Sequence, residues 1–363
     1  MIKNIKLIHI NLPLKIAYNL SYSSLNYFDT YYCIASDGKN FGIGEITPLD
    51  GYFSSKINNI WEYSESIIPS LIGVSTDEAI LTVQKLSFED KFSHSAIMTA
   101  IENIYYRIKN KDKEWQRCKL KLIGTIMAED IKEILYEIKQ LTTEEGYSVL
   151  KVKVGRNVKK DIEKIENILD IIPNNVKIRI DANQGYSFSD AKEFIDSIRS
   201  DKIKKIELFE QPLKIEEWAN MSRLNELSEL PLMLDESICD EKDIIRALSL
   251  KCCSFIKLKL MKQGSFMEIE KMFNLANENG LNVIIGNGVQ SEIGCINEAY
   301  IIDKLKANKF ASENNGFLKQ SKIFLNKNIL KDNGGQFIFD LDFDFNMFYQ
   351  GIKPFIVREQ NFF

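Results

Sequence analysis

Five charged residues stand at the ends of five successive apolar segments of this chain. They are Lys153, Asp181, Glu210, Asp235 and Lys259, and neighbours in this series lie about 24 to 29 residues apart. Each interval is long enough for one strand and one helix, so the five residues occupy equivalent places on consecutive strands. In a barrel of parallel strands that place is the rim where active sites are assembled.

The side-chain alternation of a strand sends these charges to the inside of the barrel. Successive side chains of a strand point to opposite faces. If the intervening Val, Ile and Leu residues face the surrounding helices, three pairs point inward: Lys151 with Lys153, Arg179 with Asp181, and Lys257 with Lys259. Burying a charged side chain costs roughly several kcal/mol unless the side chain is paired with an opposite charge or binds a metal. A single charged residue at a strand end is usually solvated or paired. Five charged residues at equivalent strand ends favour a functional site.

Three carboxylates at one rim are suited to Mg²⁺, which prefers oxygen ligands and keeps positions open for water or substrate. The candidate ligands are Asp181, Glu210 and Asp235. A metal there stabilises charge that develops on a substrate carboxylate when the neighbouring carbon loses a proton. Lysine can act as the base if a second ammonium and the metal lower its pKa, and Lys151 shares a strand face with Lys153.

The motifs around these residues resemble the enolase superfamily, and within it the muconate lactonising enzyme subgroup. In chain order they are FGIGEITP at 41–48, KVKVG at 151–155, DANQGYS at 181–187, EQP at 210–212, DES at 235–237 and KLMKQG at 259–264. Superfamily sites use a lysine or histidine base together with magnesium. A single short motif would be weak, but the ordered set spans nearly the whole chain.

The resemblance implies a role for each residue of the site. Asp181, Glu210 and Asp235 would bind Mg²⁺, and Lys153 and Lys259 would form an acid/base pair on opposite faces of the substrate. The residues expected to contact the substrate are Lys151, which assists the base, Asn183 and Glu313. Lys257 is a rival of Lys259, since both point inward, but the KLMKQG context favours Lys259.

The elements that must position these residues form two predicted domains and a tail. Residues 1–118 predict an α+β capping domain, with strands in KLIHINLPL, TYYCIAS and FGIGEITPL and a helix in SHSAIMTAIENIYYRI. Residues 119–320 alternate apolar runs with amphipathic segments, which predicts an α/β barrel. The candidate strands are 122–128, 149–154, 177–183, 205–211, 230–236, 254–260, 282–287 and 309–313.

The resemblance specifies this fold as a modified (β/α)7β TIM-type barrel with the α+β capping domain completed by the C-terminal tail. The tail, residues 321–363, contains the strand candidate QFIFDLDF, which is expected to return to the capping domain. Two capping-domain loops, around Tyr18–Tyr27 and around Asp50–Ser54, are expected to close over the substrate.

Composition excludes several other kinds of chemistry. The chain has 363 residues, a net charge of −4 and two isolated histidines, His9 and His94. Serine–histidine–acid triads and HExxH zinc sites are therefore disfavoured. The six cysteines form no CxxC pair, which fits reduced thiols in a cytoplasm. We expect no nucleic-acid partner, no membrane span, a small-molecule carboxylate as substrate and, by the resemblance, a homo-oligomer.

Departures from the family pattern leave the reaction open. Dipeptide epimerases of the family carry a DxD pair near the last barrel strand, where this chain has Glu313-Asn314-Asn315-Gly316, which also resembles the ExxG of lactonising members. Gln290 stands where an acid is expected. The favoured reaction is racemisation or epimerisation of a dipeptide or N-acyl amino acid. Muconate-type cycloisomerisation and o-succinylbenzoate synthesis are the alternatives, and a non-catalytic binding protein is disfavoured because all five strand-end positions are filled.

Overall fold

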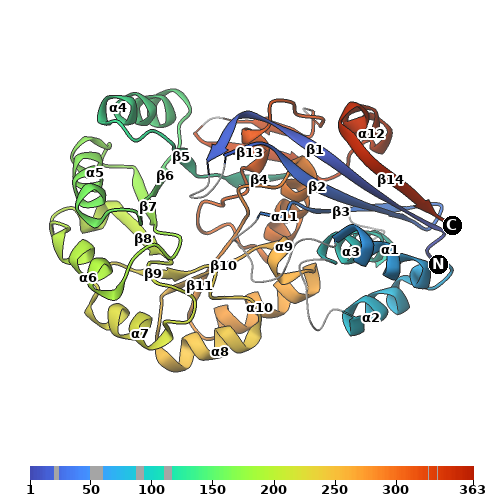
Figure 1. The fold of residues 1–363 in the computed structure, drawn as a ribbon, viewed down its shortest axis with the longest axis horizontal. Helices are drawn as coiled ribbons and strands as arrows, with labels where there is room; N and C mark the ends of the chain where they lie inside the picture. Colours follow the sequence, from blue (N-terminus) through green and yellow to red (C-terminus); the bar gives the residue numbers. More distant parts are fainter. Residues whose placement is uncertain (20–23, 50–59, 87–93, 110–116, 326, 333) are drawn as a thin grey trace.

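The computed structural model describes residues 1–19, 24–49, 60–86, 94–109, 117–325, 327–332 and 334–363. These residues form two halves that lie side by side, a helix-covered sheet that carries both termini and a barrel of parallel strands (Figure 1). Of the two predicted capping loops, residues 20–23 and the segment Asp50–Ser54 lie outside the described residues. No helix in the described part of the chain is long and apolar enough to cross a membrane.

The capping half is an antiparallel sheet with the strand order β14-β1-β2-β3. Its strands are β1 (Asn4–Asn19), β2 (Ser24–Ser36), β3 (Phe41–Ile46) and β14 (Ile356–Phe362). Its helices are α1 (Ile60–Ile67), α2 (Thr76–Leu86) and α3 (Ser95–Lys109). Helix α3 lies directly on β3, because a Cβ atom added to Gly44 would be 1.8 Å from the carbonyl oxygen of Ala96. Gly44, which belongs to the FGIGEITP motif, therefore allows α3 to pack closely on the sheet.

The C-terminal tail completes the capping sheet, but not through the strand that the sequence suggested. The QFIFDLDF segment forms β13 (Gln336–Asp340), which pairs with β4 (Arg117–Lys121) and β12 (Ile329–Lys331) in a separate three-stranded sheet. After α12 (Phe345–Ile352), the chain returns to β1 through β14, which the sequence analysis did not predict. Four of the seven residues of β14 are exposed and none is buried, so its sequence resembles a surface loop.

The barrel half contains seven parallel strands in sequential order. They are β5 (Gly124–Ile126), β6 (Val149–Lys153), β7 (Lys177–Asp181), β8 (Ile206–Glu210), β9 (Leu232–Leu234), β10 (Phe255–Leu258) and β11 (Asn282–Ile285). The helices that follow them are α4 (Ile131–Lys139), α5 (Val158–Ile171), α6 (Phe188–Ser197), α7 (Trp218–Leu227), α8 (Glu241–Leu250), α10 (Phe266–Glu278) and α11 (Glu292–Leu305). Side-chain caps begin several of them, including capping boxes at Ser187 and Asp240.

The predicted strand 309–313 takes the eighth position of the barrel. It forms an isolated parallel bridge from Ser312 to Leu122, beside β5, and Ser312 Oγ donates to the carbonyl oxygen of Ile285 at the end of β11. The segment thus closes the barrel between its first and last regular strands. The result is the predicted (β/α)7β barrel with an α+β cap.

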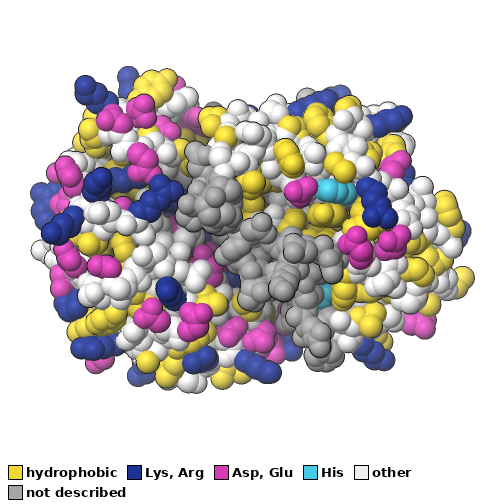
Figure 2. Space-filling view, in the orientation of Figure 1, with side chains coloured by type: hydrophobic (Ala, Val, Ile, Leu, Met, Phe, Trp, Pro, Cys, Tyr) yellow, Lys and Arg dark blue, Asp and Glu magenta, His cyan; other side chains and the backbone are white. Residues whose placement is uncertain are grey.

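The barrel interior changes from apolar to charged toward the carboxyl ends of the strands. An inward cluster of Leu208, Met233, Phe255 and Ile284 fills one layer. Arg179 pairs with Leu208 beside this layer and is nearly fully buried, and its Nε lies 2.5 Å from Oε2 of Glu207, toward the amino end of β8. On the face of the barrel half that Figure 2 shows, by contrast, acidic and basic side chains are interspersed.

Candidate active site

The five charged residues lie at the carboxyl ends of five consecutive barrel strands. Lys153, Asp181 and Glu210 are the last residues of β6, β7 and β8. Asp235 directly follows β9 and Lys259 directly follows β10. Strands β6 and β10 are four positions apart in an eight-position barrel, so Lys153 and Lys259 stand on opposite sides of its mouth.

Two buried ammonium groups link the three predicted metal ligands. Lys151 Nζ lies 2.9 Å from Asp181 Oδ2 and 3.1 Å from Glu210 Oε2. Lys257 Nζ lies 2.5 Å from Glu210 Oε1 and 3.8 Å from Asp235 Oδ2. These side chains are at most 3% exposed, so the carboxylates converge on shared cations inside the barrel.

Glu313, on the eighth barrel segment, belongs to the same cluster. Lys151 Nζ lies 2.7 Å from Glu313 Oε1, and Lys257 Nζ contacts Glu313 Oε2. Lys257 therefore spans from Glu210 to Glu313 across the interior. The inward direction predicted for Lys257 holds, and the side chain is held between two carboxylates.

The ammonium of Lys259 is held by Asp235. Lys259 Nζ lies 2.6 Å from Asp235 Oδ2. Lys262 approaches the same residue, 3.1 Å from Oδ1 and 2.5 Å from the backbone carbonyl oxygen. The sequence analysis gave no role to Lys262, although it lies in the KLMKQG motif. The short helix α9 (Leu260–Gln263) turns this side chain back toward the end of β9.

Asn183 connects Lys153 to a second acid of the DES motif. Lys153 Nζ donates to Asn183 Oδ1 at 2.8 Å, and Asn183 Nδ2 donates to Glu236 Oε1 at 3.1 Å. The backbone of Asn183 is left-handed, with φ of 41°. Such a conformation is uncommon for a residue other than glycine and is often found at functional sites.

Gln211 supports Asp235 from the neighbouring strand end, a role that the sequence analysis missed. Its Oε1 accepts hydrogen bonds from the backbone amides of Asp235 (3.0 Å) and Ser237 (3.3 Å). Its Nε2 donates to Ser237 Oγ at 2.8 Å. Gln211 is fully buried and left-handed, with φ of 35°. The sequence feature that could have identified Gln211 as part of the site is its place in the EQP motif.

The electrostatics of the cluster follow from buried charges of opposite sign. Burial lowers the pKa of Lys151, but Asp181, Glu210 and Glu313 outweigh this effect and hold the pKa well above its usual range. Burial raises the pKa of Asp235, but Lys259, Lys262 and Lys257 bring it well below its usual range.

The pKa of Glu210 shifts in the opposite direction because burial and a neighbouring acid outweigh the lysines. Burial and the neighbouring Asp181 raise its pKa to about 7, against the opposing effect of Lys151 and Lys257. Glu210 is therefore the carboxylate of the cluster whose charge is least compensated by the lysines.

Comparison with known proteins identifies the family of the chain. Residues 133–314 match the model of the family described as "Enolase C-terminal domain-like". These residues include every strand-end charge described above. The chain belongs to the enolase superfamily.

Relatives and solved structures place this superfamily member among isomerases of the muconate lactonising enzyme subgroup. The chain is 27% identical over 304 residues to the L-Ala-D/L-Glu epimerase of Francisella tularensis subsp. novicida, covering 81% of this chain and 84% of the relative. It is similar in fold to a dipeptide epimerase from Cytophaga hutchinsonii, solved with Mg and the dipeptide D-Ala-L-Val (TM-score 0.85, 19% identity, 99% of each chain). It is equally similar to the muconate lactonizing enzyme from Pseudomonas putida (TM-score 0.86, 21% identity, 98% of this chain and 99% of that one).

The carboxylates of this enolase-superfamily site are the kind of ligand that binds a hard divalent cation. In this structure, however, they are paired with lysines and are not arranged around one metal position. Among the described residues, no three acidic, histidine or cysteine side chains are arranged as ligands around one point. Instead, Asp181 Oδ2 and Glu210 Oε2 are buried and both face Lys151 Nζ. Carboxylates that converge on one positive charge supply the oxygen atoms that Mg²⁺ prefers as ligands.

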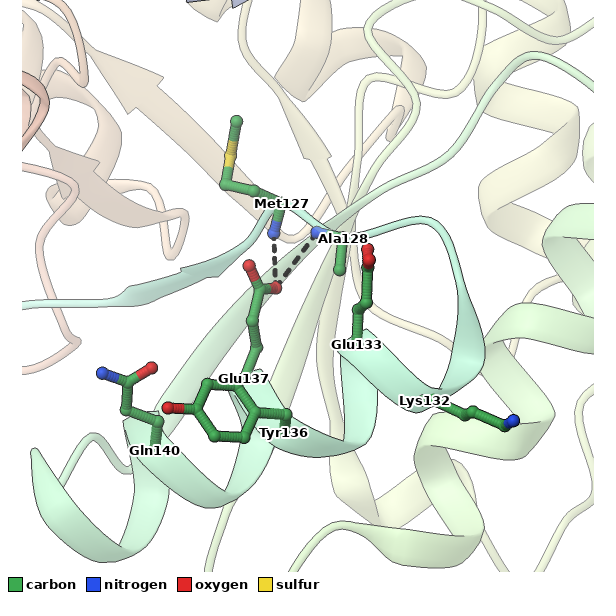
Figure 3. Close-up of a pocket in the computed structure, with 7 residues that line it drawn as sticks. All are labelled: Met127, Ala128, Lys132, Glu133, Tyr136, Glu137 and Gln140. Atoms are coloured by element: carbon green, nitrogen blue, oxygen red, sulfur yellow. Dashed lines mark hydrogen bonds between the residues drawn. The ribbon is translucent and has the colours of Figure 1, made fainter. Parts of the chain in front are cut away.

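A groove lies beside α4 and is separate from these residues. It is an open groove of about 540 Å³ beside α4, lined by Met127, Ala128, Lys132, Glu133, Tyr136, Glu137 and Gln140 (Figure 3). Glu137 Oε2 accepts hydrogen bonds there from the backbone amides of Met127 and Ala128. The carboxylate of Glu137 thus fixes the end of β5, and none of the strand-end charges lines this groove.

Proposed function

We propose that this superfamily member racemises or epimerises a dipeptide or N-acyl amino acid by moving the proton next to the substrate carboxylate. The observation that carries the proposal is the placement of two lysines, Lys153 and Lys259, on opposite sides of a carboxylate cluster at the barrel mouth. Two bases on opposite faces of one carbon allow a proton to leave one face and return to the other.

We assign Asp181, Glu210 and Asp235 as the residues that would hold Mg²⁺. When bound, Mg²⁺ would stabilise negative charge on the substrate carboxylate. Glu210 fits this role because burial and Asp181 raise its pKa to about 7, so a cation beside it relieves unfavourable charge. The dipeptide epimerase from Cytophaga hutchinsonii, which is similar in fold, was solved with Mg, and this supports magnesium as the metal.

The neighbouring residues orient the two bases. Asn183 holds the Lys153 ammonium through its side-chain oxygen, and Asp235 holds the Lys259 ammonium. Lys151 would contact the substrate carboxylate beside Lys153, and Glu313 would line the far side of the site. In each half of the reaction one lysine accepts the proton and the other donates one to the opposite face.

Cycloisomerisation of a muconate-type substrate is the second candidate. The observation that favours it is the single acid of Glu313-Asn314-Asn315-Gly316, because Glu313 is already engaged by Lys151 and Lys257. A substrate ammonium would compete with those lysines. The cytoplasmic location, the homo-oligomeric state and the domain limits at residues 118 and 320 stay predictions.

Solvent deuterium exchange tests the proposed function. N-succinyl amino acids, dipeptides, muconate and the o-succinylbenzoate precursor would each be incubated with the protein in D₂O, with Mg²⁺ and then with excess EDTA. We expect deuterium at the α-carbon of an N-acyl amino acid or dipeptide, with loss of optical purity, only when Mg²⁺ is present. Lactone formation from muconate without such exchange would support the second candidate, and no reaction with any compound would contradict both.

A further inference from the structure

Asp161 accepts four hydrogen bonds beside the barrel mouth. It lies in the first turn of α5 and is 8% exposed. Its Oδ2 accepts from the backbone amides of Gly155 (3.0 Å), Arg156 (3.2 Å) and Asn157 (3.2 Å). The fourth donor is the hydroxyl group of Tyr186, at 2.8 Å. One carboxylate oxygen is therefore bonded to two different loops.

These two loops carry the base Lys153 and its partner Asn183. Gly155 is two residues after Lys153, the last residue of β6. Tyr186 is three residues after Asn183, in the loop that follows β7. Lys153 Nζ donates to Asn183 Oδ1 at 2.8 Å. A shift of one loop against the other would therefore change the direction of the Lys153 ammonium group.

The backbones of the two loops are in direct contact. A Cβ atom on Gly155 would lie 2.4 Å from the carbonyl oxygen of Ala182, and one on Gly185 would lie 2.2 Å from the carbonyl oxygen of Gly155. Gly155 has φ of 101°, which glycine adopts more readily than other residues. The contact limits how closely the loops approach, and the bond from Tyr186 to Asp161 limits how far they separate.

Tyr186 is held in place as a hydrogen-bond donor. Its side chain is 4% exposed, and its ring packs against Phe194 and Phe209, with centroids 5.7 Å and 6.3 Å away. Burial and the bond to Asp161 raise the pKa of the Tyr186 hydroxyl, so it stays protonated at neutral pH. The ring packing and the hydroxyl bond together fix the end of this loop.

We propose that Asp161 and Tyr186 are positioning residues for the base Lys153. Asp161 holds the backbone that follows Lys153, and Tyr186 holds the loop of Asn183 to the same carboxylate. Lys153 Nζ thereby keeps its direction toward one face of the substrate carbon. This inference rests on the proposed function, in which Lys153 serves one face and Lys259 serves the other.

The second base is held by different contacts. Lys259 follows β10, on the opposite side of the mouth, and its Nζ lies 2.6 Å from Asp235 Oδ2. Its backbone amide donates to Gln263 Oε1 at 2.7 Å. Loss of the bond between Tyr186 and Asp161 should therefore slow proton removal from one face only.

Two matched variants, Tyr186→Phe and Tyr32→Phe, test the inference. Tyr186→Phe removes the hydroxyl group and keeps the packed ring, so the chain should still fold. Tyr32→Phe is the control, because Tyr32 is also buried and its hydroxyl also donates at 2.8 Å. Its acceptor is Ser291 Oγ, at the N-terminus of α11 and away from both loops.

The measurement is α-proton exchange in D₂O with MgCl₂, one stereoisomer at a time. The compounds are the two enantiomers of N-succinylphenylalanine and the epimers L-Ala-L-Glu and L-Ala-D-Glu. Lys259→Ala identifies the stereoisomer from which Lys153 removes the proton. Tyr186→Phe should slow exchange of that stereoisomer by about 10- to 100-fold and leave the other nearly unchanged. Tyr32→Phe should keep the ratio of the unaltered protein.

Conservative replacement of the acid gives a second comparison. Asp161→Asn keeps an oxygen that can accept from the backbone amides, whereas Asp161→Ala leaves these amides without their acceptor. Asp161→Asn should therefore slow the same stereoisomer less than Asp161→Ala does. Equal effects of Asp161→Asn and Asp161→Ala on both stereoisomers would contradict a positioning role.

Amide hydrogen exchange, followed by mass spectrometry, measures the link between the loops without any substrate. In Tyr186→Phe the amides of residues 154–157 and 182–186 should exchange faster than in the unaltered protein and in Tyr32→Phe. Unchanged protection of both segments would overturn the inference, because the bond would then not hold the loops together.

The outcomes separate this inference from the proposed function. Slowing of both stereoisomers to the same extent in Tyr186→Phe, or of neither, would overturn the inference. No exchange of any compound by the unaltered protein would instead reject the proposed function and with it the role of Lys153 as a base. Faster amide exchange in Tyr186→Phe would still support the link between the two loops in that case.

Discussion

At the scale of single residues, Asp235 makes the most contacts with lysine of the proposed metal ligands. Lys259 and Lys262 each approach one of its carboxylate oxygens, and Lys257 lies farther away. The combined positive charge keeps the pKa of Asp235 well below its usual range, so this residue stays ionised at neutral pH. An ionised, buried carboxylate is the type of ligand that Mg²⁺ requires.

Asp235→Asn is expected to weaken Mg²⁺ binding and turnover together. The amide keeps the size of the side chain but removes the charge that faces the lysines, so we expect Mg²⁺ affinity to fall by at least about tenfold. Calorimetric titration of MgCl₂ measures it. Asp240→Asn is the matched control, because Asp240 caps α8 outside the cluster and asparagine also caps helices. Equal Mg²⁺ affinity in the two variants would show that Asp235 is not a ligand of the metal.

Buried acids outside the site set the pH dependence of stability. Burial raises the pKa of Glu102 to about 8, although the backbone amides of Phe266 and Met267 donate to it. Because the folded protein holds this proton more tightly than the unfolded chain, the free energy of unfolding falls as pH rises from about 5 to about 8. In Glu102→Gln the free energy of unfolding, obtained from urea unfolding curves between about pH 5 and pH 8, should fall less steeply with pH. An unchanged slope would show that Glu102 is ionised in the folded protein at pH 5.

The sequence predicted which residues enter the barrel but not how they pair. Alternation along the strands was sufficient to direct Lys151 and Lys257 inward, because a strand has a fixed period. Lys262 could not be assigned in this way, since it lies in a helical turn whose direction depends on how α9 packs. Likewise, the contact between Gln211 and Asp235 joins two loops, and loops have no period to read.

At the scale of elements, the loop after β8 holds the loop after β9. Gln211 accepts from two backbone amides of the DES segment, so replacing it leaves buried donors unpaired. Gln211→Met should lower the free energy of unfolding by about 2 kcal/mol. It should also weaken Mg²⁺ binding, because Asp235 loses its support. Urea unfolding and MgCl₂ titration measure the two effects, and stability lost with Mg²⁺ affinity unchanged would limit Gln211 to a structural role.

The barrel strands could be predicted from the sequence, whereas the strands at the edges of the fold could not. Fully buried strands appear as short apolar runs between amphipathic helices, and each of the eight predicted runs contributes to the barrel. Strand β14 is an edge strand with exposed charged residues, such as Arg358, so its sequence resembles a surface segment. Its partner β1 is more than 300 residues away, and pairing at that distance depends on the assembled fold.

At the scale of the whole molecule, the buried acid Glu45 is one of the links between the cap and the barrel. Glu45, on β3, accepts hydrogen bonds from the backbone amides of Ser291 (2.6 Å) and Gly294 (2.7 Å), at the start of α11. Thr47 Oγ1 also donates to it at 2.9 Å. A carboxylate at a helix N-terminus is favoured by the unpaired amides and the helix dipole. This contact fixes the orientation of the capping sheet over one edge of the barrel.

Glu45→Ala should destabilise the whole chain and not only the cap. Several buried donors lose their acceptor, and we expect the free energy of unfolding to fall by about 3 kcal/mol. Glu78→Ala, on the exposed face of α2, is the matched control and should change it by less than about 0.5 kcal/mol. Denaturant curves give both values. A loss as small as that of the control would mean that the link through Glu45 contributes nothing to stability.

The central claim is that Lys153 and Lys259 serve opposite faces of one substrate carbon. The most direct measurement is α-proton exchange in D₂O of each enantiomer separately, in Lys153→Ala, Lys259→Ala and, for the rival base, Lys257→Ala. We predict that the first two variants lose racemisation by at least about 100-fold and bind Mg²⁺ nearly as before. Each should still exchange the proton of one enantiomer, and the two should differ in which one. Exchange of the same enantiomer by both variants, or full racemisation by either, would contradict the account.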